Sequence, residues 1–135
     1  MSLAITERQR EGIVILDLEG RLTVGEETGA LREAVLKLNT AGQVNVILNL
    51  EQVEYIDSTG LGGLVICFTT LKRGGGALKL LNLNRRNIEL LVLTKLQTVF
   101  EVFNDEQDAV NSFFPGREIR RFDILAFVQQ SQSGQ

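Results

Sequence analysis

Histidine is absent from this chain of 135 residues, and cysteine, proline and tyrosine each occur only once. Without histidine the chain lacks the usual general base, the histidine-based catalytic triads and the commonest transition-metal ligand. The single cysteine, Cys67, excludes a disulfide within the chain and a cluster of thiolate ligands. Because Cys67 lies in an apolar run, we interpret it as a core thiol. We therefore expect no enzyme, no metal and no cofactor.

Long apolar runs and basic tracts are also missing. No apolar run reaches the roughly 18–20 residues that span a membrane, and no signal peptide is visible, so we expect a cytoplasmic protein without membrane insertion. Lys and Arg number 14 against 17 Asp and Glu, which gives a net charge of −3. A nucleic-acid partner held by phosphate contacts is therefore not expected. The length and the hydrophobic fraction of 44% fit one folded domain.

Segments typical of strands alternate with segments typical of helices. β-branched and alternating apolar residues predict strands, whereas apolar spacings of three and four predict helices. The predicted strands are 3–8, 13–18, 44–50, 78–83 and 98–103, and the predicted helices are 26–39, 58–73, 88–92 and 105–114. Between the strand at 44–50 and the helix at 58–73 we expect a polar turn at Glu51–Tyr55. The alternation indicates an α/β fold with a mainly parallel or mixed sheet covered by helices.

The pattern ends at Pro115-Gly116. We expect one domain over residues 1–114 and a C-terminal extension over residues 115–135. The charged and apolar segment 117–128 could dock on the domain or on another copy of it, which would make a homo-oligomer. We expect the polar tail Gln129–Gln135 to be disordered.

The most informative segment lies between a predicted strand and a predicted helix. It reads Asp57-Ser58-Thr59-Gly60-Leu61-Gly62 and is followed by another glycine. Ser58 stands where the N-cap of the helix is expected, and capping alone is one explanation for it. The glycines need a different explanation, since each costs about 1 kcal/mol of helix propensity relative to alanine. They favour either a phosphate-binding turn or a docking surface around a modifiable hydroxyl.

Nucleotide-binding and catalytic motifs fit this segment poorly. No lysine follows the glycines, as a Walker-type loop requires, and the third glycine of a dinucleotide fingerprint is missing. A nucleophile elbow places serine between two glycines and needs a base. A nucleotide-binding domain with Gly60–Gly63 around phosphate stays open as the weakest alternative.

The same six residues, Asp57 to Gly62, resemble the Asp-Ser-Ser/Thr-Gly-hydrophobic-Gly signature of bacterial anti-sigma factor antagonists, which are members of the STAS domain family. The resemblance runs from about Ile13 to Phe114 and includes the strand before the signature and Leu78–Asn82 after it. It implies a STAS-like domain, a small mixed sheet with helices packed mainly on one side.

The resemblance also implies a function. In that family the serine aligned with Ser58 is phosphorylated by a protein partner, an anti-sigma factor that is also a serine kinase. The unphosphorylated form binds this partner and frees a sigma factor. By this resemblance Ser58 is the phosphorylation site, with Thr59 as the fallback, and the partner-binding residues are Asp57, Ser58, Thr59, Gly60, Leu61 and Gly62.

Four features depart from the family pattern. Asn49 stands where many relatives carry Asp, which we interpret as one acidic group fewer near the modification site. Thr23 replaces an acidic residue, Lys95 stands where glycine often ends the third helix, and the extension has no counterpart. Asn49 and the extension keep a second function open, a STAS scaffold or transporter-associated subunit that docks constitutively to another protein.

Other charged groups have simpler interpretations. We interpret Arg85-Arg86 as a solvated basic turn before a helix. Acidic residues at the predicted helix starts fit the helix dipole; they are Glu26, Glu27, Asp105, Glu106 and Asp108.

Overall fold

The computed structural model describes residues 3–133, with side chains through Gln129. A five-stranded sheet has the strand order β1-β2-β3-β4-β5, with β1 antiparallel to β2 and every other neighbouring pair parallel. This is the mixed sheet predicted from the sequence. The strands are β1 (Ala4–Arg10), β2 (Ile13–Leu22), β3 (Asn45–Ile56), β4 (Ala77–Leu81) and β5 (Val102–Phe103).

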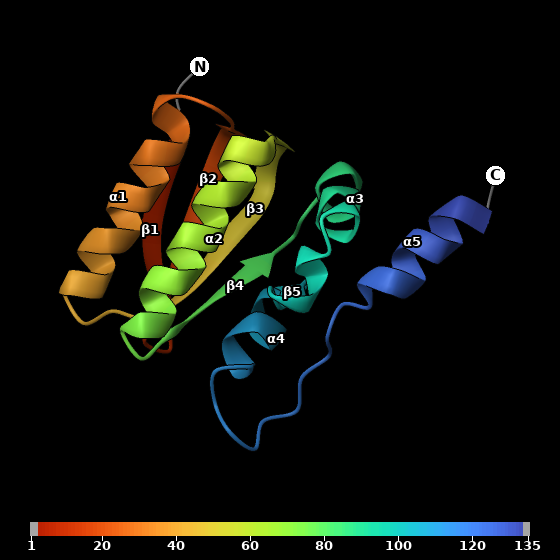
Figure 1. The fold of residues 1–135 in the computed structure, drawn as a ribbon. Coiled ribbons are helices and arrows are strands. Elements are labelled where there is room, and N and C mark those ends of the chain that lie inside the picture. Colours follow the sequence, from red (N-terminus) through yellow and green to blue (C-terminus); the bar gives the residue numbers. More distant parts are fainter. Residues whose placement is uncertain (1–2, 134–135) are drawn as a thin grey trace.

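Helices cover mainly one face of this sheet, as the family resemblance implied (Figure 1). Each parallel strand is added on the same side of the previous one, and right-handed crossovers then place the connecting helices on one face. The helices are α1 (Glu26–Thr40), α2 (Ser58–Arg73), α3 (Arg85–Leu93), α4 (Glu106–Asn111) and α5 (Ile124–Ser133), with a short 3₁₀ turn, η1 (Leu96–Thr98).

Two apolar clusters hold the layers together. The larger lies between the sheet and α1, α2, α3 and α5, and includes Leu16, Leu48 and Leu64. It also buries Cys67, and this burial raises the pKa of the thiol to about 12, in agreement with an inert core cysteine. The smaller cluster lies on the opposite face of the sheet, where α4 packs on strand residues such as Ile15 of β2 and Ile47 of β3.

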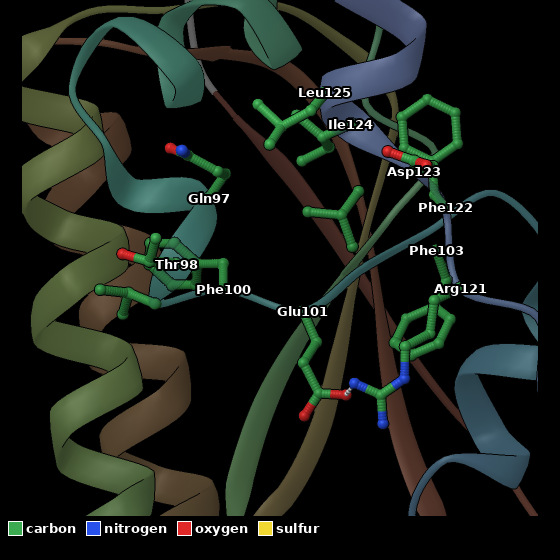
Figure 2. Close-up of a pocket in the computed structure, with 12 residues that line it drawn as sticks. Gln97, Thr98, Phe100, Glu101, Phe103, Arg121, Phe122, Asp123, Ile124 and Leu125 are labelled. Atoms are coloured by element: carbon green, nitrogen blue, oxygen red, sulfur yellow. Dashed lines mark ion pairs between the residues drawn. The ribbon is translucent and has the colours of Figure 1, made fainter.

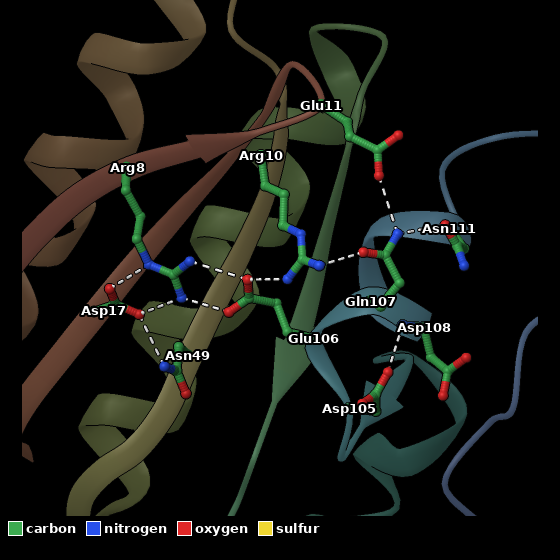
Figure 3. Close-up of polar contacts among 10 residues, drawn as sticks. All are labelled: Arg8, Arg10, Glu11, Asp17, Asn49, Asp105, Glu106, Gln107, Asp108 and Asn111. Atoms are coloured by element: carbon green, nitrogen blue, oxygen red, sulfur yellow. Dashed lines mark hydrogen bonds and ion pairs between the residues drawn. The ribbon is translucent and has the colours of Figure 1, made fainter.

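A network of charges ties α4 to the first two strands (Figure 3). Arg8 bonds Asp17 at 2.6 Å and Glu106 at 2.5 Å, and Arg10 bonds Glu106 at 2.7 Å. Asn49 donates to Asp17 at 2.8 Å. Hydrogen bonds from Arg8, and then from Arg10, lower the pKa of Glu106 to about 2. Glu106 is thus held by two arginines, which the helix dipole alone did not predict.

The polar turn predicted at Glu51–Tyr55 is wrong. Strand β3 continues through it to Ile56, because β2 is also long and pairs with it as far as Leu22. Val53 and Ile56 in this stretch are buried in the core, while the polar residues Glu51, Gln52 and Glu54 are exposed. The strand predicted at 98–103 is likewise shorter, since η1 occupies its start.

The C-terminal extension folds back onto its own domain. Ile124 and Val128 on α5 are buried in the larger cluster, near α3. Part of the apolar segment 117–128 therefore docks on its own domain, as one of the two predicted alternatives has it, while Leu125 on the same helix is 53% exposed. Helix α5 runs to Ser133, so residues 129–133 are helical where we expected disorder, and residues 134–135 lie outside the described part.

Candidate functional site

Asp57, not Ser58, is the N-cap of α2, which corrects the sequence prediction. Its Oδ1 accepts from the Gly60 amide at 2.8 Å, and its Oδ2 accepts from the Val24 amide at 3.0 Å. The Asp57 amide donates in turn to the Leu22 carbonyl at 3.0 Å. One carboxylate therefore joins the end of β2 to the first turn of α2. Ser58 becomes the first residue of the helix, and its hydroxyl is not needed for the cap.

Two of the glycines in α2 are explained by close packing. A Cβ at Gly60 would overlap the Leu22 carbonyl, and one at Gly63 would overlap the Thr28 methyl group on α1. Gly62 is different, because a Cβ there would have no atom within 4 Å. The fold itself therefore requires Gly60 and Gly63, whereas no contact within the described part of the chain explains Gly62.

Apart from Asp57, which is half-buried as the helix cap, the predicted partner-binding residues divide into two groups. Gly60 and Leu61 are buried and support the fold. Ser58, Thr59 and Gly62 are exposed on the outer side of α2. In the part of the chain that the structure describes, neither hydroxyl makes a side-chain hydrogen bond. Both are accessible to another protein.

Ser58 lies at the edge of a hollow of about 420 Å³ between β3, α2 and α3. Its walls are formed by Tyr55, Ile56, Asp57, Ser58, Arg86, Glu89, Leu90 and Leu93. The guanidinium of Arg86 lies over the Tyr55 ring, 4.4 Å from its centroid. Arg86 is exposed, in agreement with the prediction of a solvated basic residue, but it lies in the first turn of α3 rather than before the helix, and it forms part of this wall.

Large apolar side chains are exposed close to the same end of α2. Val24, whose amide is held by Asp57, is 71% exposed, and Leu93 in the hollow is 81% exposed. Ile66 is 45% exposed one turn after Gly62 on α2. Exposed apolar residues that gather around polar groups are typical of protein–protein contact surfaces. We call Ser58, Thr59, Gly62 and these three side chains the α2 surface.

Asn49 is not part of the α2 surface, which corrects our expectation for it. It lies inside β3, seven residues before the strand ends, or roughly 20 Å from Ile56 at the usual strand rise. Its amide belongs to the network around Asp17. An aspartate in place of Asn49 would therefore act on that network and not on Ser58.

A second hollow of about 420 Å³ lies where the extension meets η1 and β5 (Figure 2). Phe100, Phe103 and Phe122 line it, and an ion pair of 3.3 Å between Arg121 and Glu101 closes one side. It is separate from the hollow beside Ser58 and shares no residue with it. Among the described residues, no helix is long and apolar enough to cross a membrane, and no group of three potential metal ligands forms.

Comparison with known families identifies the fold. The model of the STAS domain matches residues 4–109, which is most of the chain. The chain belongs to the STAS domain family. It is 33% identical over 102 residues to the anti-sigma-B factor antagonist of Bacillus subtilis strain 168, covering 76% of this chain and 92% of that protein.

Solved structures agree with this STAS fold. A Thermotoga maritima protein classed with the anti-sigma factor antagonists is 24% identical, with a TM-score of 0.75 over 81% of this chain and 93% of that one. The phosphorylated form of SpoIIAA from Bacillus is 20% identical, with a TM-score of 0.63 over 81% of this chain and 98% of that one. These likenesses confirm the predicted fold class.

Sequence reasoning missed several members of the site. Only the fold brings three further residues to the α2 surface or its hollow: Arg86, Leu93 and Val24. Val24 follows β2, whereas Arg86 and Leu93 lie on α3, which follows β4. One signal was present for Arg86, since parallel strands bring the loops at their carboxyl ends to the same edge of the sheet. Ser58 and the start of α3 follow two such neighbouring strands.

Proposed function

We propose that this protein is an anti-sigma factor antagonist that works by partner switching. Unphosphorylated, it binds an anti-sigma factor that is a serine kinase, and a sigma factor is freed. Phosphorylation of Ser58 ends this binding. The observation that carries the proposal is the exposed Ser58 hydroxyl, without a hydrogen-bond partner of its own among the described residues, at the start of a helix that Asp57 already caps.

The family relationship supports the same function. The relative in Bacillus subtilis is named an anti-sigma-B factor antagonist, and the match covers 92% of that relative. STAS scaffolds that bind constitutively are the second function left open by the sequence. The free hydroxyl beside an exposed glycine favours switching, because a constitutive contact has no use for a modifiable group.

The α2 surface has the composition that such a partner requires. Gly62 leaves the helix backbone open to close approach, and Val24, Ile66 and Leu93 offer apolar area on either side. The occupant we propose is the anti-sigma factor kinase, which must bring its active site to Ser58. Partner binding and phosphorylation then use the same surface.

The chemical step is transfer of the γ-phosphoryl group of ATP. A bond forms between Ser58 Oγ and phosphorus, the bond from phosphorus to the oxygen bridging to the β-phosphate breaks, and ADP leaves. The hydroxyl proton passes to a base on the kinase. This protein contributes only the acceptor hydroxyl and therefore acts as a regulator rather than as an enzyme.

The added charge explains how binding is lost. Phosphoserine carries about −1.5 to −2 charge at neutral pH. The free amides of the first helical turn tolerate this charge, so the fold is expected to survive. In the complex, the dianion would lose water against a surface shaped for a hydroxyl. A loss of about 4 kcal/mol there weakens binding roughly a thousandfold.

Incubation with the cognate anti-sigma factor kinase and ATP, followed by mapping of the phosphate, tests the proposal. We expect phosphate on Ser58, with none on the Ser58→Ala variant. In Thr59→Ala, which removes the neighbouring exposed hydroxyl on the α2 surface, phosphate is expected still to map to Ser58, whatever the change in the rate of transfer. Phosphate on neither residue would overturn the proposal.

A further inference from the structure

Arg86 occupies an unusual position for an arginine on the surface. It lies in the first turn of α3 and stacks on Tyr55, which fixes the direction of its guanidinium. Within the described part of the chain it has no carboxylate partner, in contrast to its neighbour Arg85, which pairs with Glu89 at 4.0 Å. A positioned guanidinium without an anion is a ready receptor for one.

The hollow beside α2 brings Arg86 and Ser58 together. Both residues line it, from α3 and α2 respectively, and its volume of about 420 Å³ has room for a phosphate group. Its other charged groups are Asp57 and Glu89. The Asp57 carboxylate is already bonded to two amides, and Glu89 is paired with Arg85. Arg86 is therefore the positive group in the hollow that is left to meet a new anion.

We propose that Arg86 receives the phosphate of phosphorylated Ser58 within the same molecule. This inference rests on the proposed function, because it concerns the state of the protein after Ser58 is modified. The planar guanidinium pairs with two phosphate oxygens, and the phosphate turns into the hollow toward α3. The pair stabilises the modified state and fills the hollow, so the partner meets a closed and negatively charged surface.

Titration of the phosphate by ³¹P NMR tests this inference without a kinase. Phosphoserine is incorporated at position 58 during synthesis of the full chain, in wild type and in Arg86→Gln. Because a nearby cation favours the dianion, the phosphate pKa in wild type is expected to be lower than in Arg86→Gln by about 0.5. Arg73→Gln is the control, since Arg73 lies in the last turn of α2, at the end of the helix opposite Ser58 and outside the hollow, and it is expected to match wild type.

A second measurement covers the case in which the substitution disturbs α3. Arg86→Lys keeps the charge but loses the planar pair, so its phosphate pKa is expected between those of wild type and Arg86→Gln. Amide spectra of the unphosphorylated variants report whether α3 is intact. Equal phosphate pKa values in folded wild type and Arg86→Gln would overturn the role of Arg86. That result leaves the proposed function standing, whereas failure of the kinase to modify Ser58 overturns the function itself.

Discussion

Two polar regions of this molecule differ in whether their side chains have partners: the charge network near α4 and the start of α2. On the α4 side, Arg8, Arg10, Asp17 and Glu106 satisfy one another at short distances (Figure 3). At the start of α2, the Ser58 hydroxyl is exposed, and Arg86 stacks on the Tyr55 ring with no carboxylate partner among the residues that the structure describes. Groups with partners hold the structure together, whereas accessible groups without partners are available for binding. The comparison therefore separates a structural network from the proposed docking surface.

The glycines of α2 show the same difference between structural positions and accessible positions. The largest effect on stability is expected at the structural glycine Gly60. In Gly60→Ala the new Cβ collides with the Leu22 carbonyl, which is backbone and cannot move aside. We expect a loss of about 3 kcal/mol or more in the free energy of unfolding, measured by urea denaturation.

Gly62→Ala is the matched control for Gly60→Ala. Nothing lies within 4 Å of its new Cβ, and alanine favours the helix, so we expect a gain of about 0.5–1 kcal/mol. Affinity for the anti-sigma factor kinase should nevertheless fall, because the methyl group stands on the α2 surface. Unchanged affinity would remove Gly62 from the docking surface.

Asp57 is expected to stabilise the fold, like the charged groups near α4. Asp57→Ala loses the cap of α2 and the bond to the Val24 amide, at a cost of about 1–2 kcal/mol. Asp57→Asn keeps a capping oxygen and is expected to retain most of that stability in the same thermal unfolding assay. If Asp57→Ala melted like wild type, the link between β2 and α2 would not depend on this carboxylate.

Glu106→Gln tests the charge network through its pH dependence. The folded pKa of Glu106 is about 2, below the ordinary value of 4.5, so its charge adds stability above about pH 4.5 that is lost as the pH falls toward 2. We expect the variant to be less stable than wild type by about 1 kcal/mol at pH 7. This difference should shrink toward zero near pH 2. Chemical denaturation at several pH values measures it, and a constant difference would exclude ionisation as its cause.

Ser58→Ala is expected to have the smallest effect on stability. Because Asp57 is the cap, loss of the hydroxyl should change the free energy of unfolding by no more than about 0.5 kcal/mol. The variant should also bind the partner persistently, since it cannot be phosphorylated there. A marked drop in melting temperature would show that the hydroxyl supports the helix after all.

Local patterns in the sequence were enough for the order of strands and helices as far as α4, and for placing Ser58 between a strand and a helix. They were not enough where two local interpretations competed. Asp57 and Ser58 are both good capping residues, and only the positions of the Gly60 and Val24 amides decide between them. The end of β3 shows a polar cluster that resembles a turn, yet pairing with β2 keeps it extended.

Arg86 illustrates a second limit of the sequence. Its charge can be read from one position, but its role depends on Tyr55 below it and on Ser58 across the hollow. These residues come from three different elements, and no local spacing relates them. The tertiary fold is needed to bring the Ser58 hydroxyl and the Arg86 guanidinium to one hollow.

The most direct test of the central claim is the affinity of the anti-sigma factor kinase for two forms of this protein. Isothermal titration compares the unmodified chain with the chain that carries phosphoserine at position 58, and thermal unfolding of both forms checks the fold. We predict roughly thousandfold weaker binding of the phosphorylated form, corresponding to about 4 kcal/mol, with nearly equal melting temperatures. Equal affinities of two folded forms would contradict the account, because charge at Ser58 would then not control binding.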